Sequence, residues 1–409
     1  MKEYLFRDIV IGDEGLLKGP FGSDLKSTLY VPKGDNTYKV YLQENILNQT
    51  LDAGNHYISE EYFRSKMYRY LVKENDFIVT CDGTLGEIYQ LIGIKEKGII
   101  SSSLLRITIN PEIADYDYFY YLFKHQIKKE LIIQGNNSVL KHLPGVEVIR
   151  NHKVHLPDLE EQKKIGKILK DIDRKISLNN QINDELGKVI DDIYCYWFEN
   201  YKFPNNSGAT VYNDKIKKDI PLGWEVLPLL SLCFWETNSQ PPKSEFSYEM
   251  KEGYIRFIQN RDYDSDDYIT YIPKTKSLSI AGKYDILIDK YGDAGTVRYG
   301  IEGAFNVALA KIGVRNDKYL EYVRSFLSSE PVYAYLHNAC MASTRASLNE
   351  ESIKPLFILV PPEPIVEEFE KTIHLIREKI LLNQDENRAL IKTRNEIMPL
   401  LMNGQAIVG

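Results

Sequence analysis

The sequence predicts an α+β protein in which two pseudo-symmetric α/β domains are joined by two long helices that form an antiparallel coiled coil. Three observations support this: an internal repeat, β-rich runs followed by a helical pattern in each half, and two stretches with heptad spacing. The repeat is clearest where Asp76–Ile88 aligns without a gap with Asp285–Val297, so that Gly83 meets Gly292. A chain built from two such copies is expected to fold with approximate two-fold symmetry.

The composition is ordinary for a globular protein, and 409 residues leave room for two or three domains. A net charge of -7 argues at first against nucleic-acid binding, but a basic face on one domain would suffice for phosphate contact. No apolar run approaches the roughly 20 residues that span a bilayer, and the start of the chain lacks a signal-peptide core. The four cysteines are scattered without a Cys-x-x-Cys pair. We therefore expect a cytoplasmic protein with reduced thiols and no membrane partner.

Each half begins with a globular domain in which β-rich runs alternate with Gly- and Asn-bearing turns. The first domain covers residues 1–156 and the second covers residues 204–360. Strands are predicted in the first domain at 39–43, 77–80 and 104–108, followed by a helix at 117–131. The second domain repeats this order, with strands at 254–258, 286–288 and 309–312 and a helix from 319 to about 336. Mixed or antiparallel sheets are expected in both.

Each domain is followed by a helical spacer, at residues 157–203 and 361–409, whose apolar seam alternates steps of four and three residues. Both seams carry two asparagines at their centre. The seam positions are Ile165, Leu169, Ile172, Ile176, Asn179, Asn183 and Leu186 in the first spacer, and Ile373, Ile376, Ile380, Asn383, Asn387 and Leu390 in the second. If the helices pack on each other, the chain's connectivity makes them antiparallel and brings the asparagines face to face. Pro399 is expected to kink or end the second helix, and Gly404 is a plausible stop.

The sequence contains no recognisable catalytic or metal-binding motif. It has no Gly-x-x-x-x-Gly-Lys-Ser/Thr phosphate loop, no Gly-x-Gly-x-x-Gly after a strand and no His-x-x-x-His pair for zinc. The acidic run Asp262–Asp267 resembles a calcium loop but lacks the central Gly and the later Glu. We therefore predict no catalytic residue, no metal and no cofactor in this chain.

Polar loops at corresponding places in both copies are candidates for contact with double-stranded DNA. Among them, Gln43–Asn45 and Gln259–Arg261 follow equivalent predicted strands and are expected to correspond. Asn and Gln can pair with adenine and Arg with guanine, while short polar or basic side chains can contact phosphate. Ordinary solvated turns are the alternative, because the glycines can simply permit positive φ. The candidates are Phe21, Ser23, Asp24, Lys26, Gln43, Asn45, Asp82, Thr84 and Lys141 in the first copy, and Gln240, Lys243, Gln259, Asn260, Arg261, Tyr291, Asp293, Thr344 and Arg345 in the second.

Several segments together resemble the specificity subunit of type I restriction-modification enzymes. The most characteristic runs from Leu156-Pro157 through Glu161-Gln162 and Ile165 into the helix that reaches Asn179. The other matching segments are Gly19–Ser23, Leu42–Ile46 and Ile193–Phe198. The likeness covers essentially the whole chain, including its duplication.

This resemblance implies that the two domains are target recognition domains, each reading one half of a split DNA sequence. The spacers would set the unread gap and dock two methyltransferase subunits, which use S-adenosylmethionine, and motor-nuclease restriction subunits, which use Mg and ATP, would join the assembly. The second copy departs from the pattern in two places. Asn238–Lys243 replaces the Gly-Pro-Phe-Gly loop, and Pro361–Phe369 lacks the Glu-Gln pair, so docking there is expected to be less regular.

Other functions remain open from the sequence alone. The chain could serve a related fused, type IIB-like restriction system, or act as a coiled-coil adaptor that binds only protein. It could also be a free-standing methyltransferase or nuclease with an unrecognised site. Salt-sensitive DNA binding would exclude the adaptor, and absence of turnover by the pure chain would exclude the enzyme.

Overall fold

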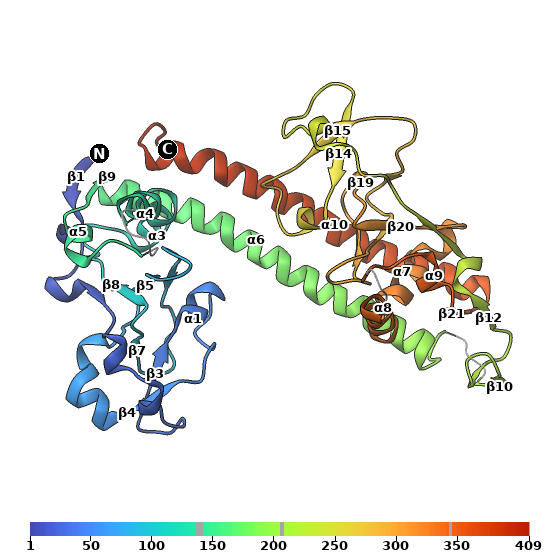
Figure 1. Ribbon diagram of the computed structural model, residues 1–409, viewed down its shortest axis with the longest axis horizontal. Coiled ribbons are helices and arrows are strands. Elements are labelled where there is room, and N and C mark those ends of the chain that lie inside the picture. The colour runs from blue at the N-terminus through green and yellow to red at the C-terminus, as the bar shows by residue number, and fades with distance from the viewer. Residues whose placement is uncertain (136–141, 205–207, 343–345, 409) are drawn as a thin grey trace. The chain divides into compact units, whose positions relative to one another are not determined.

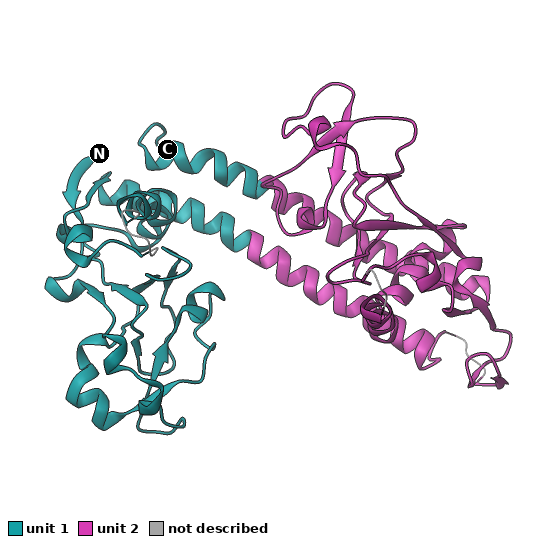
Figure 2. Cartoon of the chain, viewed as in Figure 1, with its two compact units in different colours: residues 1–175, 390–409 teal, residues 176–389 magenta. Residues whose placement is uncertain are grey.

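The computed structural model describes residues 1–135, 142–204, 208–342 and 346–408, and the chain divides into two compact units (Figures 1 and 2). Unit 1 comprises Met1–Lys175 and Leu390–Gly409, and unit 2 comprises Ile176–Ala389. The boundary falls inside two long helices, α6 (Leu159–Tyr194) and α10 (Glu363–Met402). Each unit therefore consists of one globular head and one end of each long helix.

The head of unit 1 is built on three small sheets. An antiparallel sheet has the order β2-β8-β5-β6, a mixed sheet has the order β4-β3-β7, and β1 pairs with β9. The strands are β1 (Lys2–Leu5), β2 (Leu16–Lys18), β3 (Thr37–Tyr41), β4 (Tyr57–Ser59), β5 (Phe77–Thr80), β6 (Ile88–Gln90), β7 (Gly98–Ile100), β8 (Leu104–Ile107) and β9 (Lys153–Leu156).

Helical segments connect these strands. A continuous helical stretch is formed by α3 (Tyr116–Leu122), a π-helical turn and α4 (Lys128–Gly135), and it includes the helix predicted at 117–131. The shorter helices are α1 (Gln43–Leu47), α2 (Glu60–Tyr62) and α5 (Val146–Arg150). Strand β3 ends at Tyr41, two residues earlier than predicted, because Gln43 already begins α1.

Unit 2 repeats the sheet order of unit 1. Its sheets have the orders β13-β20-β17-β18 and β15-β14-β19-β16, and β12 pairs with β21. An additional hairpin, β10 with β11, precedes them. The strands are β10 (Thr210–Asn213), β11 (Lys218–Pro221), β12 (Glu225–Pro228), β13 (Cys233–Glu236), β14 (Tyr254–Ile258), β15 (Tyr271–Pro273), β16 (Ile280–Ala281), β17 (Ile286–Asp289), β18 (Val297–Arg298), β19 (Gly303–Phe305), β20 (Leu309–Val314) and β21 (Phe357–Val360).

The single helix predicted from 319 to about 336 is wrong, because two helices occupy this stretch. They are α7 (Leu320–Ser328) and α8 (Glu330–Ala342), and Ser329 between them is extended. Pro331 explains the break, since its ring disfavours helical geometry before it and it has no N–H to continue the hydrogen-bond ladder of α7. A short helix, α9 (Glu350–Ile353), follows.

The duplication extends to backbone details. In the repeated turn, the Gly86 N–H donates to the Thr80 carbonyl (2.8 Å), and the Gly295 N–H donates to the Asp289 carbonyl (2.9 Å). Both glycines have positive φ, which side-chain-bearing residues adopt only with strain. The parallel strand pairs β3·β7 and β14·β19 likewise begin at Gly98 and Gly303, where a Cβ would collide with the neighbouring strand.

Each head shares a hydrophobic core with the helix ends of its own unit. In unit 1 this core includes Ile165 and Leu169 of α6 and Leu401 of α10. In unit 2 it includes Ile190 of α6 and Phe369 and Ile373 of α10. The helix ends are therefore integral to the heads, and burial of these apolar side chains stabilises each unit.

The two long helices pair antiparallel, as the seam predicts. Within unit 2, the Asn179 amide donates to the Asn387 oxygen (2.9 Å), and the Asn383 amide donates to the Asn183 oxygen (2.8 Å). Within unit 1, Arg394 pairs with Asp173 (2.5 Å). Pro399 does not end α10, which continues to Met402 before Gly404 adopts a φ of 66°.

Candidate nucleic-acid interface

The loop after β2 presents the most exposed aromatic side chain among the predicted contact residues. Phe21 is 82% exposed, and Ser23 and Lys26 nearby are also exposed. The loop starts at Gly19, where a Cβ would clash with the Ser101 backbone. Asp24 is half-buried, and its carbonyl accepts the Tyr62 hydroxyl (2.6 Å), which ties the loop to the head.

The helical turn after β3 holds the side chains of Gln43 and Asn45 in hydrogen bonds to the backbone, while Glu44 is exposed. Asn45 is fully buried, and its side chain bonds the backbone of Leu42, Thr50 and Ala53. The structure therefore does not support Asn45 as a base reader, because its amide is already used to cap α1 and hold the following loop. The Gln43 amide donates to the Asp82 carbonyl (2.6 Å) and so connects this turn to the β5–β6 turn.

The β5–β6 turn carries Asp82 and the exposed Thr84. Gly83 and Gly86 take positive φ here, which lets the turn fold back tightly. The Asp82 carboxylate lies 2.6 Å from Nδ1 of His142, while its second oxygen has no protein partner among the residues described. His142 therefore orients a carboxylate that keeps free acceptor capacity.

A groove of about 530 Å³ brings some of these residues together in unit 1. The predicted contact residues Phe21 and Asp82 line it. Lys18, Tyr70 and Arg150, which were not predicted, line it as well. Lys18 directly precedes the selected Gly19–Ser23 segment, whereas Tyr70 and Arg150 come from segments that meet Phe21 only through the fold of the head. The groove combines an exposed ring, two basic groups and an oriented carboxylate.

The corresponding loop of unit 2 carries Gln240 and Lys243, both exposed. Strand register places Leu16 opposite Ile107 in unit 1 and Trp235 opposite Ile312 in unit 2, which makes the loops after β2 and β13 equivalent. In place of Gly19, this loop begins with a buried Asn238, whose amide donates to the carbonyls of Ser279 (2.8 Å) and Phe305 (3.1 Å).

The turn after β14 is the counterpart of α1. The sequence paired Gln43 with Gln259, whereas the structure pairs Gln43 with Asn260, one residue further along. The capping side chain is Asn45 in unit 1 and Asp262 in unit 2, which accepts from the Gln259 N–H (3.3 Å). Asn260 is therefore the counterpart of Gln43, and its amide donates to Asp289 (2.9 Å). Arg261 is exposed and lies over the Tyr268 ring, 5.7 Å from its centre.

Polar groups of the β17–β18 turn complete the surface of unit 2. Tyr291 and Asp293 are exposed, and Tyr291 occupies the position of Asp82 in the repeat. Asp289 beneath them is buried and paired with Arg298 (3.0 Å), and its burial raises its pKa. Gln259 turns inward and donates to Thr270 (2.9 Å). Lys141, Thr344 and Arg345 lie outside the described residues.

The sequence matches the family described as the type I restriction modification DNA specificity domain over residues 25–188 and again over 221–392. The chain belongs to this DNA specificity family. The two matches cover both copies of the repeat, including most of each long helix.

Relatives of this DNA specificity protein cover most of its length. It is 27% identical over 77% of its chain, and 74% of the relative, to the type I restriction enzyme MjaIX specificity subunit of Methanocaldococcus jannaschii. It is 25% identical to the MjaVIII specificity subunit of the same organism, over 88% of each chain. Its fold resembles that of the type I restriction-modification system S subunit from M. genitalium, with a TM-score of 0.59, 13% identity and coverage of 98% and 95%.

The Gln162 side chain of the family-like segment has an internal role in this specificity protein. It is buried, accepts from the Asp115 N–H (3.0 Å) and donates to the carbonyls of Ile113 and Pro157 (both 3.0 Å). Gln162 follows Pro157 by five residues. In the second copy the residue five positions after Pro361 is Val366, which is also buried. The missing Gln thus changes how α10 is anchored to its own head.

No helix in the described part of the chain is long and apolar enough to cross a membrane. Within the same residues, no group of three or more His, Cys, Asp or Glu side chains is arranged to hold a metal ion. Of the cysteines, Cys81, Cys233 and Cys340 are buried, Cys195 is half-buried, and all four are free thiols.

Proposed function

We propose that this chain is the DNA-reading, non-catalytic subunit of a type I restriction-modification complex and that each head reads one half of a split target. The observation that carries the proposal is the presence of two equivalent loop surfaces with different side chains. Asp82 in one head is replaced by Tyr291 in the other, and Phe21 is replaced by Gln240. Equivalent scaffolds with unlike contact groups suit two unlike half-sequences on one duplex.

Both heads are near neutral, with 19 Lys and Arg against 20 Asp and Glu in residues 1–156 and 18 against 20 in residues 204–360. Sequence-independent binding to DNA by this chain alone is therefore expected to be weak. Two methyltransferase subunits, which bind S-adenosylmethionine, and restriction subunits, which use Mg and ATP, would complete the assembly. Exposed apolar side chains on the long helices, including Leu178, Ile182, Leu375 and Leu382, support a protein-docking role for these helices. Docked subunits would add phosphate contacts to those made by the heads.

The decisive experiment is assembly of the chain with methyltransferase subunits encoded beside it, followed by mapping of methylated adenines on random-sequence DNA. The expected result is one split motif with a modified adenine in each half. The pure chain, incubated with DNA, labelled S-adenosylmethionine and magnesium, should show no turnover. Methylation or cleavage by the pure chain would overturn the non-catalytic assignment, and an unsplit motif would overturn the division of reading between the heads.

A further inference from the structure

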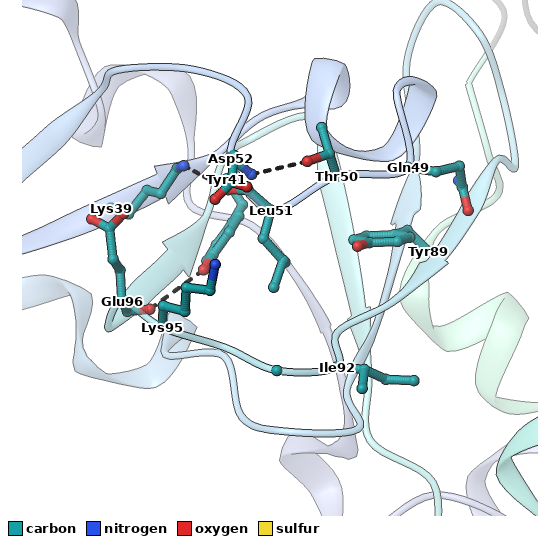
Figure 3. Close-up of a pocket in the computed structure, with 11 residues that line it drawn as sticks. Lys39, Tyr41, Gln49, Thr50, Leu51, Asp52, Tyr89, Ile92, Lys95 and Glu96 are labelled. Carbon is teal, nitrogen blue, oxygen red and sulfur yellow. Dashed lines mark hydrogen bonds between the residues drawn. The ribbon is translucent and has the colours of Figure 1, made fainter. Parts of the chain in front are cut away.

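Unit 1 has a second hollow, which is lined by the buried Lys39 and is separate from the groove beside Phe21 (Figure 3). Its volume is about 230 Å³, and none of the predicted DNA-contact residues lines it. Lys39 and Tyr41 come from β3, Gln49 and Asp52 from the loop after α1, and Lys95 from the segment before β7. Figure 3 shows these side chains arranged around one space.

Lys39 is 2% exposed, and its ammonium group makes one hydrogen bond, to the Leu51 carbonyl (2.6 Å). An ammonium group has three protons to donate, so two remain for other acceptors. Within the described residues, no carboxylate lies within 4.0 Å of Lys39 Nζ. Glu96 also lines the hollow, but its carboxylate is occupied by Lys33 (3.1 Å) and the Tyr57 hydroxyl (3.1 Å).

The second copy of the repeat shows what such a site accommodates. Strand register makes Arg256 the counterpart of Lys39: Gly98 lies opposite Lys39, and Gly303 approaches the Arg256 carbonyl in the same way. Arg256 is paired with the Asp266 carboxylate (2.6 Å), which comes from the loop after the equivalent helical turn, and with the buried Asp262 carboxylate (3.5 Å). In unit 2, therefore, an internal anion neutralises the cation at this strand position.

We propose that the hollow beside Lys39 binds a small oxyanion, such as a phosphate group, in the place that the Asp266 carboxylate takes in unit 2. A buried cation without a counter-ion is costly, and an external anion would relieve this cost. Lys95 adds a second positive charge at the rim, which offsets the negative charge of Asp52. The anion can be free in solution or belong to a DNA backbone, and both sources offer the same chemistry.

The test uses the full-length protein and inorganic phosphate, with chloride at matched ionic strength as the reference. Phosphate should raise the melting temperature of the wild type. Lys95→Glu, which reverses an exposed positive charge at the rim of the hollow, should weaken phosphate binding about tenfold or more and leave the fold intact. Lys39→Met should abolish the response if that variant folds.

Competition with a short duplex distinguishes the two sources of the anion. If a backbone phosphate occupies the site, phosphate will weaken duplex binding by the wild type more than by Lys95→Glu. If a free anion occupies it, duplex binding will be equal in both proteins while the phosphate response still differs. A wild type that responds equally to phosphate and chloride, or a Lys95→Glu variant that responds like the wild type, would overturn the proposal.

Discussion

Asp82 shows how a single side chain can carry half-site specificity. Its carboxylate only accepts hydrogen bonds, which suits the exocyclic amino group of cytosine or adenine. Asp82→Asn adds donors at the same place and should relax preference at one base position by about 1–3 kcal/mol. The measurement is sequencing of DNA selected by the assembled complex.

Arg261→Ala is the variant chosen to test unit 2 and should relax one position of the other half-site only. Its exposed guanidinium is free of ion pairs in the described structure and suits guanine. Equal weakening on all sequences by either variant would reassign that residue to phosphate contact.

Glu370 gives unit 2 a specific pH dependence. It is half-buried and accepts from the N–H groups of Glu321 (3.0 Å) and Tyr322 (2.8 Å) at the start of α7. Burial is the main cause that raises its pKa from 4.5 to about 7, against the opposing effect of these two hydrogen bonds. Because the folded-state pKa is the higher one, the protonated carboxyl favours folding below pH 4.5, and this contribution is lost as pH rises through 7.

Glu370→Gln removes this titration. The unfolding free energy of the wild type, measured by urea denaturation, should fall relative to Glu370→Gln between pH 4.5 and 7.5 by on the order of 1–3 kcal/mol. Glu368→Gln, at an exposed position on the same helix, is the control and should show no such relative change. Parallel pH profiles for wild type and Glu370→Gln would contradict the assignment.

At the scale of secondary-structure elements, two glycines of α6 have opposite roles. A Cβ on Gly166 would lie 2.6 Å from the Tyr118 nitrogen and 2.9 Å from an Asp115 carboxylate oxygen, whereas a Cβ on Gly187 would meet nothing within 4 Å. Gly166→Ala should therefore destabilise the protein by about 1–3 kcal/mol, because α6 must move away from the start of α3. Gly187→Ala should stabilise it by roughly 0.5–1 kcal/mol through helix propensity. The unfolding free energy of both variants, measured by thermal or urea denaturation, tests these expectations. Equal changes in the two variants would contradict the close approach of Gly166 to Tyr118.

The central asparagines connect the two long helices. Asn179→Leu alone leaves the buried Asn387 oxygen without its Asn179 donor and should cost about 1–3 kcal/mol of unfolding free energy. Asn179→Leu combined with Asn387→Leu should recover part of this loss, because apolar side chains can pack in the seam, but should loosen the register. A double-mutant cycle measures the coupling, and strictly additive losses would show that the pair does not act as a unit.

At the scale of the whole molecule, the proposed function makes helix length a determinant of the DNA target. Insertion of seven residues at facing positions of α6 and α10 keeps the heptad pattern and lengthens each helix by roughly 10 Å. The unread gap should grow by about three base pairs, at 3.4 Å per pair, with both half-sequences unchanged. Methylation mapping of the assembled variant checks this. Retention of the original gap at full rate would contradict the ruler mechanism.

Local sequence patterns predicted the duplication and the pairing of the long helices. The repeated Asp76–Ile88 and Asp285–Val297 segments, the heptad seams and their paired asparagines depend on residue spacing along one chain, which is readable without a structure. The break at Ser329 was also signalled by Pro331, although the apolar pattern around it predicted one helix. The predicted pairing of Gln43–Asn45 with Gln259–Arg261 was wrong by one residue. It matched the two Gln side chains, whereas the residues with the same structural role are Asn45 and Asp262, which cap the two turns.

The sequence by itself determined the duplication, the fold class and the antiparallel direction of the helices, because periodicity and connectivity are local or topological properties. Only the tertiary structure decided which polar side chains face outward. Asn45 and Gln43 turn inward, His142 orients Asp82, and Lys39 lies buried without a carboxylate partner. These outcomes depend on hydrogen-bond partners distant in sequence, and a buried polar group takes whichever partner the fold places beside it.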